Sequence, residues 1–363
     1  MISRRTWRNF DWVLLACVLL IMVFGVAMIG SATRGTEELA DLWQRQAIYV
    51  LSGLALLALV AAFDYRFYEN LHRVLYVVMI VLLIAVLAIG QISQGVQRWI
   101  ITNAVQPSEL AKVILIIGLA KLLGDRDGQM NRMRNLLISL AYALLPMLLI
   151  YLQPNLSTAL TLGFIWLVMV LAAGARLVHL GLLGLLTVIV SPFIWLSLKG
   201  YMRDRLLLFL NPESNPDSFY NVQQALIGIG SGGWLGKGFG SGTQSQLRFL
   251  RVRHTDYIFS VIGEELGLVG VLVLLFLFAF LLWRILRAAD MAKDAFGRLI
   301  CVGVASILFL QATVNIGVNL GLLPVTGLPL PFVSYGGSAM WTFLIALGLV
   351  ESAAMRRKKL DFE

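Results

Sequence analysis

The chain has 363 residues, of which 59% are apolar and only 13% are charged. A charged share this far below the ~25% of typical soluble domains excludes an ordinary soluble enzyme. At about 20 residues per crossing, the length allows roughly ten membrane-spanning helices. The composition therefore predicts an all-α polytopic membrane protein. The net charge of +9 does not indicate nucleic-acid binding, because in a membrane protein the positions of the charges matter more than their sum.

Ten apolar runs follow one another along the chain. The first comes after Arg4, Arg5 and Arg8; it is longer than a signal-peptide core and has no convincing cleavage site, so it predicts a retained helix. No repeat or linker marks a second domain, and we expect one membrane domain over residues 1–363. The predicted spans are 13–29, 45–62, 74–91, 108–123, 136–152, 157–174, 178–198, 258–282, 299–320 and 338–354.

The distribution of basic residues predicts the orientation. If both termini are cytoplasmic, the inner segments hold 18 of the 29 Lys and Arg residues, as the positive-inside rule requires. Seven of the others lie in one segment, 199–257, which is predicted to be a long extracytoplasmic loop between helices 7 and 8. Long loops escape the rule, so this segment is either a solvated basic loop or an outward surface for an anionic ligand.

A charged pair lies inside the fourth predicted span. A charge in a transmembrane segment costs roughly 3 kcal/mol, so Glu109 and Lys112 require a reason. Pro107 suits a first helical turn, a carboxylate there is favoured by the helix dipole, and the spacing of three allows the two side chains to pair. Either the carboxylate satisfies the dipole while the lysine snorkels, or the pair lines a polar cavity that opens outward.

The segment 228–242 contains eight glycines in 15 residues. Such a stretch can bring backbone N–H groups close to a phosphate, or it can be a tightly turned loop without a ligand. Its GxGxxG letters do not follow a strand, and its GKG lacks the Ser or Thr of a P-loop, so no nucleotide site is predicted. Glu264 and Glu265, in the next span, have no role that the sequence reveals.

Asp256 lies at the outer membrane boundary, just before the apolar run that starts at 258 and close to several arginines. An aspartate at a helix start is often only an N-cap. The alternative is a carboxylate that accepts a proton from a hydroxyl group as a general base. His254 and Asp256 together give too few ligands to indicate a metal site.

The segment 321–338 has three prolines within eight residues and cannot be a continuous helix. Broken backbone at membrane depth occurs where protein buries it or where it lines a cavity. Just before this segment, Gln311, Asn315 and Asn319 repeat at four-residue spacing on one helical face. That pattern is more typical of hydrogen bonding between helices than of a ligand site.

Five ordered motifs together resemble the SEDS family of bacterial cell-wall polymerases, across nearly the whole chain. Other tracts, GTQSQL and RLLLFLNPESNP among them, look more like the RodA elongation branch than the FtsW division branch. The five motifs are QPSELAK (106–112), GSGGWLGKGFGSGTQSQLRFL (230–250), RHTDYIF (253–259), EELGLVG (264–270) and NIGVNLGLLPVTGLPLPFVSYGGS (315–338).

The resemblance implies a ten-helix peptidoglycan glycosyltransferase that polymerises lipid II, an undecaprenyl-diphosphate-linked disaccharide pentapeptide, at the outer face of the bacterial cytoplasmic membrane during elongation. It implies two partners: a class B penicillin-binding protein, which is a single-span transpeptidase, and the elongation machinery. No cofactor is required, since the donor is already activated, although a divalent cation (Mg or Mn) could assist the diphosphate.

The resemblance also implies roles for individual residues. Asp256 matches the family's essential aspartate and is expected to be the catalytic base, or else a metal ligand. Glu109 and Lys112 match the family's charged pair, and Arg205 falls in its basic loop. The residues expected to bind substrate are Ser108, Glu109, Lys112, Arg205, Lys237 and Arg253.

The chain departs from the family pattern at four places. Asn155 stands where a carboxylate is often expected, Arg251 replaces a common proline, the outer loop 100–105 is short, and 219–221 lacks the usual glycine. These departures concern the fit of substrate and partner more than the reaction class.

Other functional classes compete with the polymerase. A flippase for lipid-linked precursors suits intramembrane charges and broken helices equally well. A scaffold that only positions the transpeptidase is a further alternative. An intramembrane protease is distant, because Ser334 and Ser338 have no histidine in the outer half of any span to activate them.

Overall fold

The computed structural model describes residues 8–34, 37–89, 91–93, 96–99, 106–198, 200–211, 216–247, 249–250 and 252–356. Ten helices in these residues coincide with the ten predicted spans, so the polytopic helical fold is confirmed. By length and hydropathy, seven of them qualify as membrane spans. The ten are α2 (Trp12–Ala32), α3 (Leu42–Ala62), α4 (Tyr65–Ile89), α5 (Pro107–Gly124), α6 (Met133–Leu152), α7 (Leu156–Ala172), α8 (Leu177–Ser197), α12 (Ile258–Asp290), α13 (Ala295–Asn319) and α14 (Gly337–Met355).

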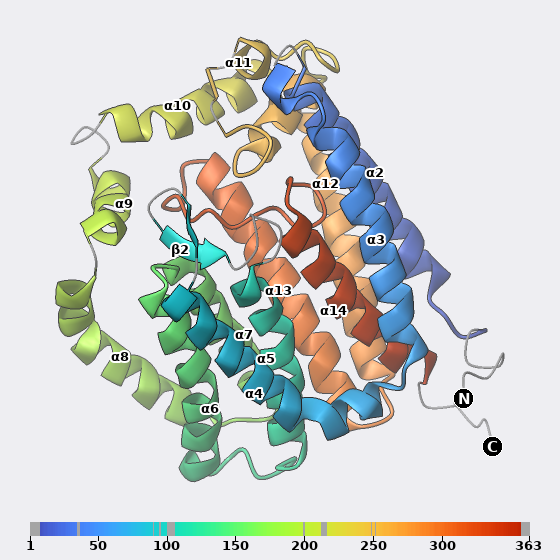
Figure 1. Ribbon diagram of the computed structural model, residues 1–363, viewed down its shortest axis with the longest axis vertical. Helices are drawn as coiled ribbons and strands as arrows, with labels where there is room; N and C mark the ends of the chain where they lie inside the picture. Colours follow the sequence, from blue (N-terminus) through green and yellow to red (C-terminus); the bar gives the residue numbers. More distant parts are fainter. Residues whose placement is uncertain are drawn as a thin grey trace.

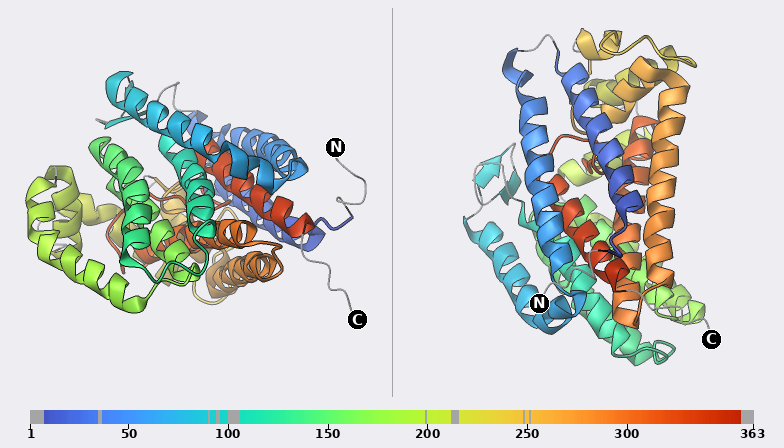
Figure 2. Two further views of the ribbon diagram at one scale, coloured as in Figure 1. Left: turned by 90° about the horizontal axis from the view of Figure 1, so that it is seen from below. Right: turned by 90° about the vertical axis from the view of Figure 1, so that its right-hand side faces the viewer.

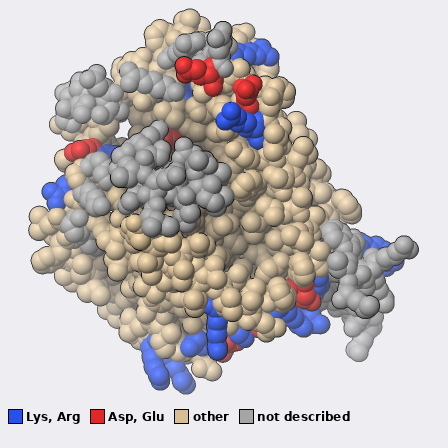
Figure 3. Space-filling model, viewed as in Figure 1, with Lys and Arg blue, Asp and Glu red and all other residues tan. Residues whose placement is uncertain are grey.

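The helices form a bundle around α13 (Figure 1). Helix α13 packs against α5, α7, α12 and α14, while α14 packs along α3. Helices α13 and α14 are the most buried of the seven, whereas α3 and α12 expose apolar side chains such as Leu51 and Phe276. Figure 3 shows charged side chains at the two ends of the molecule with a largely uncharged band between them. This distribution fits a bundle that crosses a bilayer.

The segment 199–257 connects α8 to α12, as the sequence predicts, but three helices occupy much of it, and its side of the membrane stays a prediction. They are α9 (Gly200–Leu210), α10 (Pro216–Ser231) and α11 (Thr243–Gln246). Together with α8, they form an arc that leaves the bundle after α7 and returns above α12 (Figure 1). Helix α10 buries Val222 and Ala225 and exposes other positions, so packing against the bundle stabilises it as a helix.

Helix α12 is broken near its N-terminal end. Gly267 has φ 63° and ψ −163°, a conformation open essentially only to glycine, so residues 258–266 and 268–290 are two helices joined at a sharp bend. The predicted single span of 258–282 is therefore wrong in its continuity. Its beginning, next to Asp256, is correct.

Two further segments lack helix. Strands β1 (Gln91–Ser93) and β2 (Val96–Trp99) form a small antiparallel ribbon that the sequence does not predict. The proline-rich segment between α13 and α14 is non-helical backbone within the bundle, as predicted. The short outer loop 100–105 and Arg251 lie outside the described residues.

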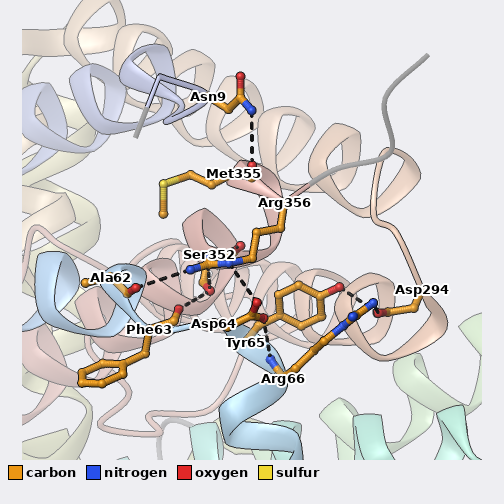
Figure 4. Close-up of polar contacts among 10 residues, drawn as sticks. All are labelled: Asn9, Ala62, Phe63, Asp64, Tyr65, Arg66, Asp294, Ser352, Met355 and Arg356. Atoms are coloured by element: carbon orange, nitrogen blue, oxygen red, sulfur yellow. Dashed lines mark hydrogen bonds and ion pairs between the residues drawn. The ribbon is translucent and has the colours of Figure 1, made fainter. Parts of the chain in front are cut away.

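Both described ends of the chain meet at the same end of the bundle, where Asn9 donates a hydrogen bond to the carbonyl of Met355 (Figures 2 and 4). Polar contacts tie neighbouring helix ends together there. Arg356 pairs with Asp64, and Asp294 accepts hydrogen bonds from Tyr65 and Arg66 (Figure 4). The termini therefore share one side, and which side of the membrane it is stays a prediction.

Candidate active site

Asp256 does not cap the helix that follows it. The N-cap of α12 is Tyr257, whose side chain makes no capping hydrogen bond. The acceptor comes instead from another helix: Oδ1 of Asn319 accepts from the backbone N–H of Ser260 at 3.1 Å and from its hydroxyl at 2.6 Å. The capping interpretation of Asp256 is therefore wrong, because its carboxylate is not used to cap α12.

The backbone around Asp256 is held by the proline-rich segment. The N–H of Tyr335 donates to the carbonyl of His254 at 3.0 Å, and the hydroxyl of Ser334 donates to the carbonyl of Thr255 at 2.7 Å. The proline-rich, non-helical backbone thus meets the backbone that precedes α12. These hydrogen bonds satisfy backbone polar groups of both segments that would otherwise be costly to bury.

The next carbonyl along the chain, that of Asp256, accepts two amide hydrogen bonds from α13. Nδ2 of Asn319 lies 2.8 Å from it and Nδ2 of Asn315 lies 3.1 Å from it. Asn315 also donates to the carbonyl of Leu328 at 2.9 Å. The predicted hydrogen bonding between helices is confirmed for Asn319, which bonds Ser260 of α12, whereas Asn315 bonds to non-helical backbone. The third residue of the pattern, Gln311, is buried without a partner among the described residues.

The Asp256 carboxylate is half-buried and makes no hydrogen bond to a described residue. Burial raises the pKa of Asp256 to about 6, while the positive charge of Arg205 acts in the opposite direction. A β-carbon placed on Gly327 would lie 3.9 Å from Oδ2 of Asp256, so the carboxylate faces a position without a side chain.

Arg205 reaches the same place from the arc. Its Nη1 lies 3.4 Å from the carbonyl oxygens of Val325 and Thr326, which precede Gly327. The structure therefore brings together two of the predicted site residues, Asp256 and Arg205, although they are far apart in sequence. In this arrangement, the carboxylate of Asp256 can accept a proton from a bound group, and the cation Arg205 can stabilise negative charge on another.

His254, two residues before Asp256, has a half-buried ring. Burial, together with the charge of Arg253, lowers the pKa of His254, and its ring contacts Tyr335 edge to face at 5.9 Å. No group of three or more His, Cys, Asp or Glu residues that could hold a metal ion occurs in the described part of the chain.

Glu109 and Lys112 do form the predicted pair, with 2.7 Å between Oε2 and Nζ. However, the Lys112 side chain has no exposed surface and Glu109 has almost none, and Nζ lies 5.8 Å from the centre of the Phe343 ring. Neither residue lines an outward cavity in this structure, and Ser108, next to them, is also buried. The outward-cavity interpretation is thus not what the structure shows.

Arg253 and Lys237 are both engaged within the protein. Nε of buried Arg253 donates to the carbonyl of Ala32, so it satisfies the end of α2. Nζ of Lys237 lies 2.8 Å from Oε1 of buried Glu264 and 2.8 Å from the hydroxyl of Thr243. These contacts give both cations a structural role. Their expected contact with substrate stays a prediction.

The glycine-rich segment packs backbone against backbone on α12. Its N–H groups at 237 and 238 donate to the carbonyls of Glu264 and Glu265, both at 3.0 Å. A β-carbon on Gly236 would lie 2.2 Å from the carbonyl oxygen of Glu265, and one on Gly232 would lie 1.9 Å from that of Gly263. These two N–H groups are used within the protein, so they do not form the phosphate cradle considered for this segment. The glycines serve close approach instead.

Asn155, which stands where a carboxylate is often expected, is the N-cap of α7. Its side chain accepts from the N–H of Thr158 as the N-cap of α7, and asparagine caps helices as well as aspartate does. The hydroxyl of Ser157, in the first turn of α7, donates to the carbonyl of Thr326 at 2.7 Å. Helix α7 thus joins the segment that faces Asp256.

Sequence reasoning missed the partners of Asp256 more than Asp256 itself. The spacing of Asn315 and Asn319 indicates a shared face, yet nothing local identifies the carbonyl of Asp256, some 60 residues away, as their acceptor. The signal for Glu264 and Glu265 was available, since two adjacent acids in an apolar span require partners.

Comparison with known proteins agrees with this architecture. The family model described as "Cell cycle protein", that of FtsW, RodA and SpoVE, matches residues 10–359. The peptidoglycan glycosyltransferase MrdB of Escherichia coli K12 is 39% identical over 357 residues, covering 97% of this chain and 95% of that protein.

Two solved structures share the fold. A chain from a peptidoglycan synthase complex, described as coordinating polymerization and crosslinking, is 34% identical with a TM-score of 0.82, covering 96% of this chain and 99% of that one. The rod shape determining protein RodA of Thermus thermophilus is 32% identical with a TM-score of 0.73, covering 96% of this chain and 98% of that one. The chain therefore belongs to the SEDS family of FtsW, RodA and SpoVE, and it is RodA-like.

Proposed function

We propose that this chain is a peptidoglycan glycosyltransferase that polymerises lipid II into glycan strands during cell elongation. The observation that carries the proposal is the state of Asp256 in a member of this family. Its carbonyl is held by Asn315 and Asn319, while its carboxylate makes no hydrogen bond to any residue that the structure describes and lies near the cation Arg205. A polar group of this kind is costly to keep near the protein interior, which indicates a chemical task.

In the proposed reaction, a sugar hydroxyl of the acceptor attacks the anomeric carbon of the lipid-linked donor. Asp256 takes the hydroxyl proton as general base, a C–O bond forms with inversion, and the lipid diphosphate leaves with the bonding electrons. Arg205 stabilises the negative charge that develops on the leaving group. Lys112, paired with Glu109, would join this task only if the buried pair becomes accessible to substrate.

A divalent cation such as Mg²⁺ or Mn²⁺ would supply Lewis-acid stabilisation of the diphosphate. Mg²⁺ is often held by one or two carboxylates together with substrate phosphates, so Asp256 is the residue that fits it here. In that case Asp256 would act as a ligand instead of a base.

We further propose that the protein lies in the bacterial cytoplasmic membrane with both termini in the cytoplasm. Its proposed partners are a class B penicillin-binding protein and the elongation machinery. The first is supported by the similarity to a chain of a complex that coordinates polymerization and crosslinking. The orientation is supported by the 18 basic residues on the side of the termini.

The test is polymerisation of lipid II by the purified chain in detergent, with and without a class B partner. Without a second leaflet, polymer can come only from an enzyme, which separates the proposal from a flippase. We expect glycan strands from the parent and none above background from Asp256→Asn, inserted and folded at parental levels. A variant as fast as the parent would refute the role of Asp256.

A further inference from the structure

Two buried side-chain amides of α13 donate hydrogen bonds to the backbone of Asp256. Nδ2 of Asn319 and Nδ2 of Asn315 both donate to its carbonyl oxygen, and Asn319 is fully buried while Asn315 is 2% exposed. The two residues are one helical turn apart on the most central helix of the bundle. They therefore fix the Asp256 carbonyl from a rigid element.

The environment of Asn319 allows only one orientation of its amide. On one side, the carbonyls of Asp256 and Asn315 only accept, each at 2.8 Å from Nδ2. On the other side, the N–H of Ser260 donates to Oδ1. An amide turned the other way would place its oxygen against these two carbonyl oxygens and leave the N–H of Ser260 without an acceptor. Asn319 thus joins Asp256 to the first turn of the helix behind it.

We propose that Asn315 and Asn319 are positioning residues for the glycosyl transfer, an inference that rests on the proposed function. Both keep the carboxylate of Asp256 aimed at the site by holding its carbonyl, and Asn319 also supplies the acceptor that caps α12, so that the carboxylate is not needed there. Neither residue contacts the substrate, so each acts through Asp256.

The experiment measures kcat and KM for lipid II in Asn315→Ala and Asn319→Asp, beside the parent and Asp256→Asn. Asn319→Asp keeps the acceptor for Ser260, loses the donor to the carbonyls of Asp256 and Asn315, and adds a carboxylate. We expect kcat to fall by about 10- to 100-fold while KM stays within about twofold, because the base is misplaced but the residues that bind substrate are unchanged.

The matched control is Gln311→Met, on the same helix one turn earlier. Gln311 is equally buried, and neither of its amide atoms has a hydrogen-bond partner among the described residues, so kcat should stay parental. Each kcat is normalised to the folded, monodisperse fraction, and the thermal midpoints are compared. If Asn319→Asp does not fold, Asn315→Ala, which removes one of the two amides, decides the question.

The outcomes separate the two proposals. An active parent with parental kcat in both asparagine variants overturns the positioning role alone. So does a loss no larger than that of Gln311→Met, or one seen in KM and not in kcat. A parent that makes no polymer from lipid II overturns the proposed function, and the positioning role with it.

Discussion

Nζ of Lys237 lies 2.8 Å from Oε1 of Glu264, so the cation in the middle of the glycine-rich segment neutralises a carboxylate that is 1% exposed. Thr243 and the N–H of Gln244 complete the shell of Glu264. A buried carboxylate that loses its cation is strongly destabilising, whereas loss of both partners is milder.

We therefore expect Lys237→Met to lower the free energy of unfolding by about 2 kcal/mol, a value reduced for the partial exposure of the lysine. The double variant Lys237→Met/Glu264→Gln should recover part of this loss, as measured by thermal unfolding in detergent. Lys293→Met, an exposed lysine, is the control and should change nothing. If the double variant is stable but its KM for lipid II is raised, Lys237 contacts substrate as the sequence predicts.

The bend at Gly267 makes a second prediction. A β-carbon there would lie 2.3 Å from the N atom of Gly236 and 2.6 Å from the carbonyl oxygen of Trp234, in a conformation that other residues avoid. Gly267→Ala should therefore cost about 3 kcal/mol or more and reduce the folded yield.

Gly230→Ala is the matched control for Gly267→Ala. Gly230 lies in helix α10 with nothing within 4 Å of the added β-carbon, so its thermal midpoint should stay unchanged or rise slightly. Equal midpoints for the two variants would show that the bend is not a rigid feature of the protein.

The helices themselves could be predicted because each is an apolar run of sufficient length. The bend at Gly267 could not, because a glycine in an apolar helix is usually tolerated, and here its cause is the glycine-rich segment about 30 residues earlier. The same holds for 199–257, whose helices depend on packing against the bundle and not on a strong local apolar pattern.

Individual residues of the site could be predicted from the sequence, but their partners could not. Asp256 stands out by charge and position and Arg205 by the family resemblance, and the structure brings them together. The partner of Arg253 could not be foreseen, because the carbonyl of Ala32 comes from a helix 221 residues away. Residue types in sequence thus indicate which groups need partners, and only the fold decides which partners they receive.

Asn155 provides a third prediction. Because its side chain caps α7, Asn155→Asp should leave the thermal midpoint and the polymerisation rate close to parental values. Asn155→Ala removes the cap and should cost about 1 kcal/mol. Thermal unfolding of the three proteins checks both expectations. A higher rate in Asn155→Asp would instead show that a carboxylate at 155 takes part in the reaction.

The buried pair of Glu109 and Lys112 gives a fourth prediction. Removing one charge leaves the other uncompensated, so Lys112→Met alone should destabilise the protein by about 3 kcal/mol or more, and Glu109→Gln/Lys112→Met by less. Thermal midpoints measure both. If the double variant is stable but makes no polymer, Lys112 has a chemical role and the pair must open to substrate during turnover.

The pH dependence of polymerisation provides the last prediction. A general base must be deprotonated, and burial raises the pKa of Asp256 to about 6. We therefore expect kcat/KM to rise about tenfold per pH unit below pH 6 and to level off above about pH 7.

The charge of Arg205 lowers the pKa of Asp256. Arg205→Ala should therefore raise this pKa and move the acid limb of the kcat/KM profile to higher pH. Arg203→Ala is the control: Arg203 lies on the same helix but donates to the carbonyls of Trp195 and Leu196, so its acid limb should match the parent's. An Arg205→Ala profile with a lower plateau and an unmoved limb would assign Arg205 to the substrate and not to the charge state of Asp256.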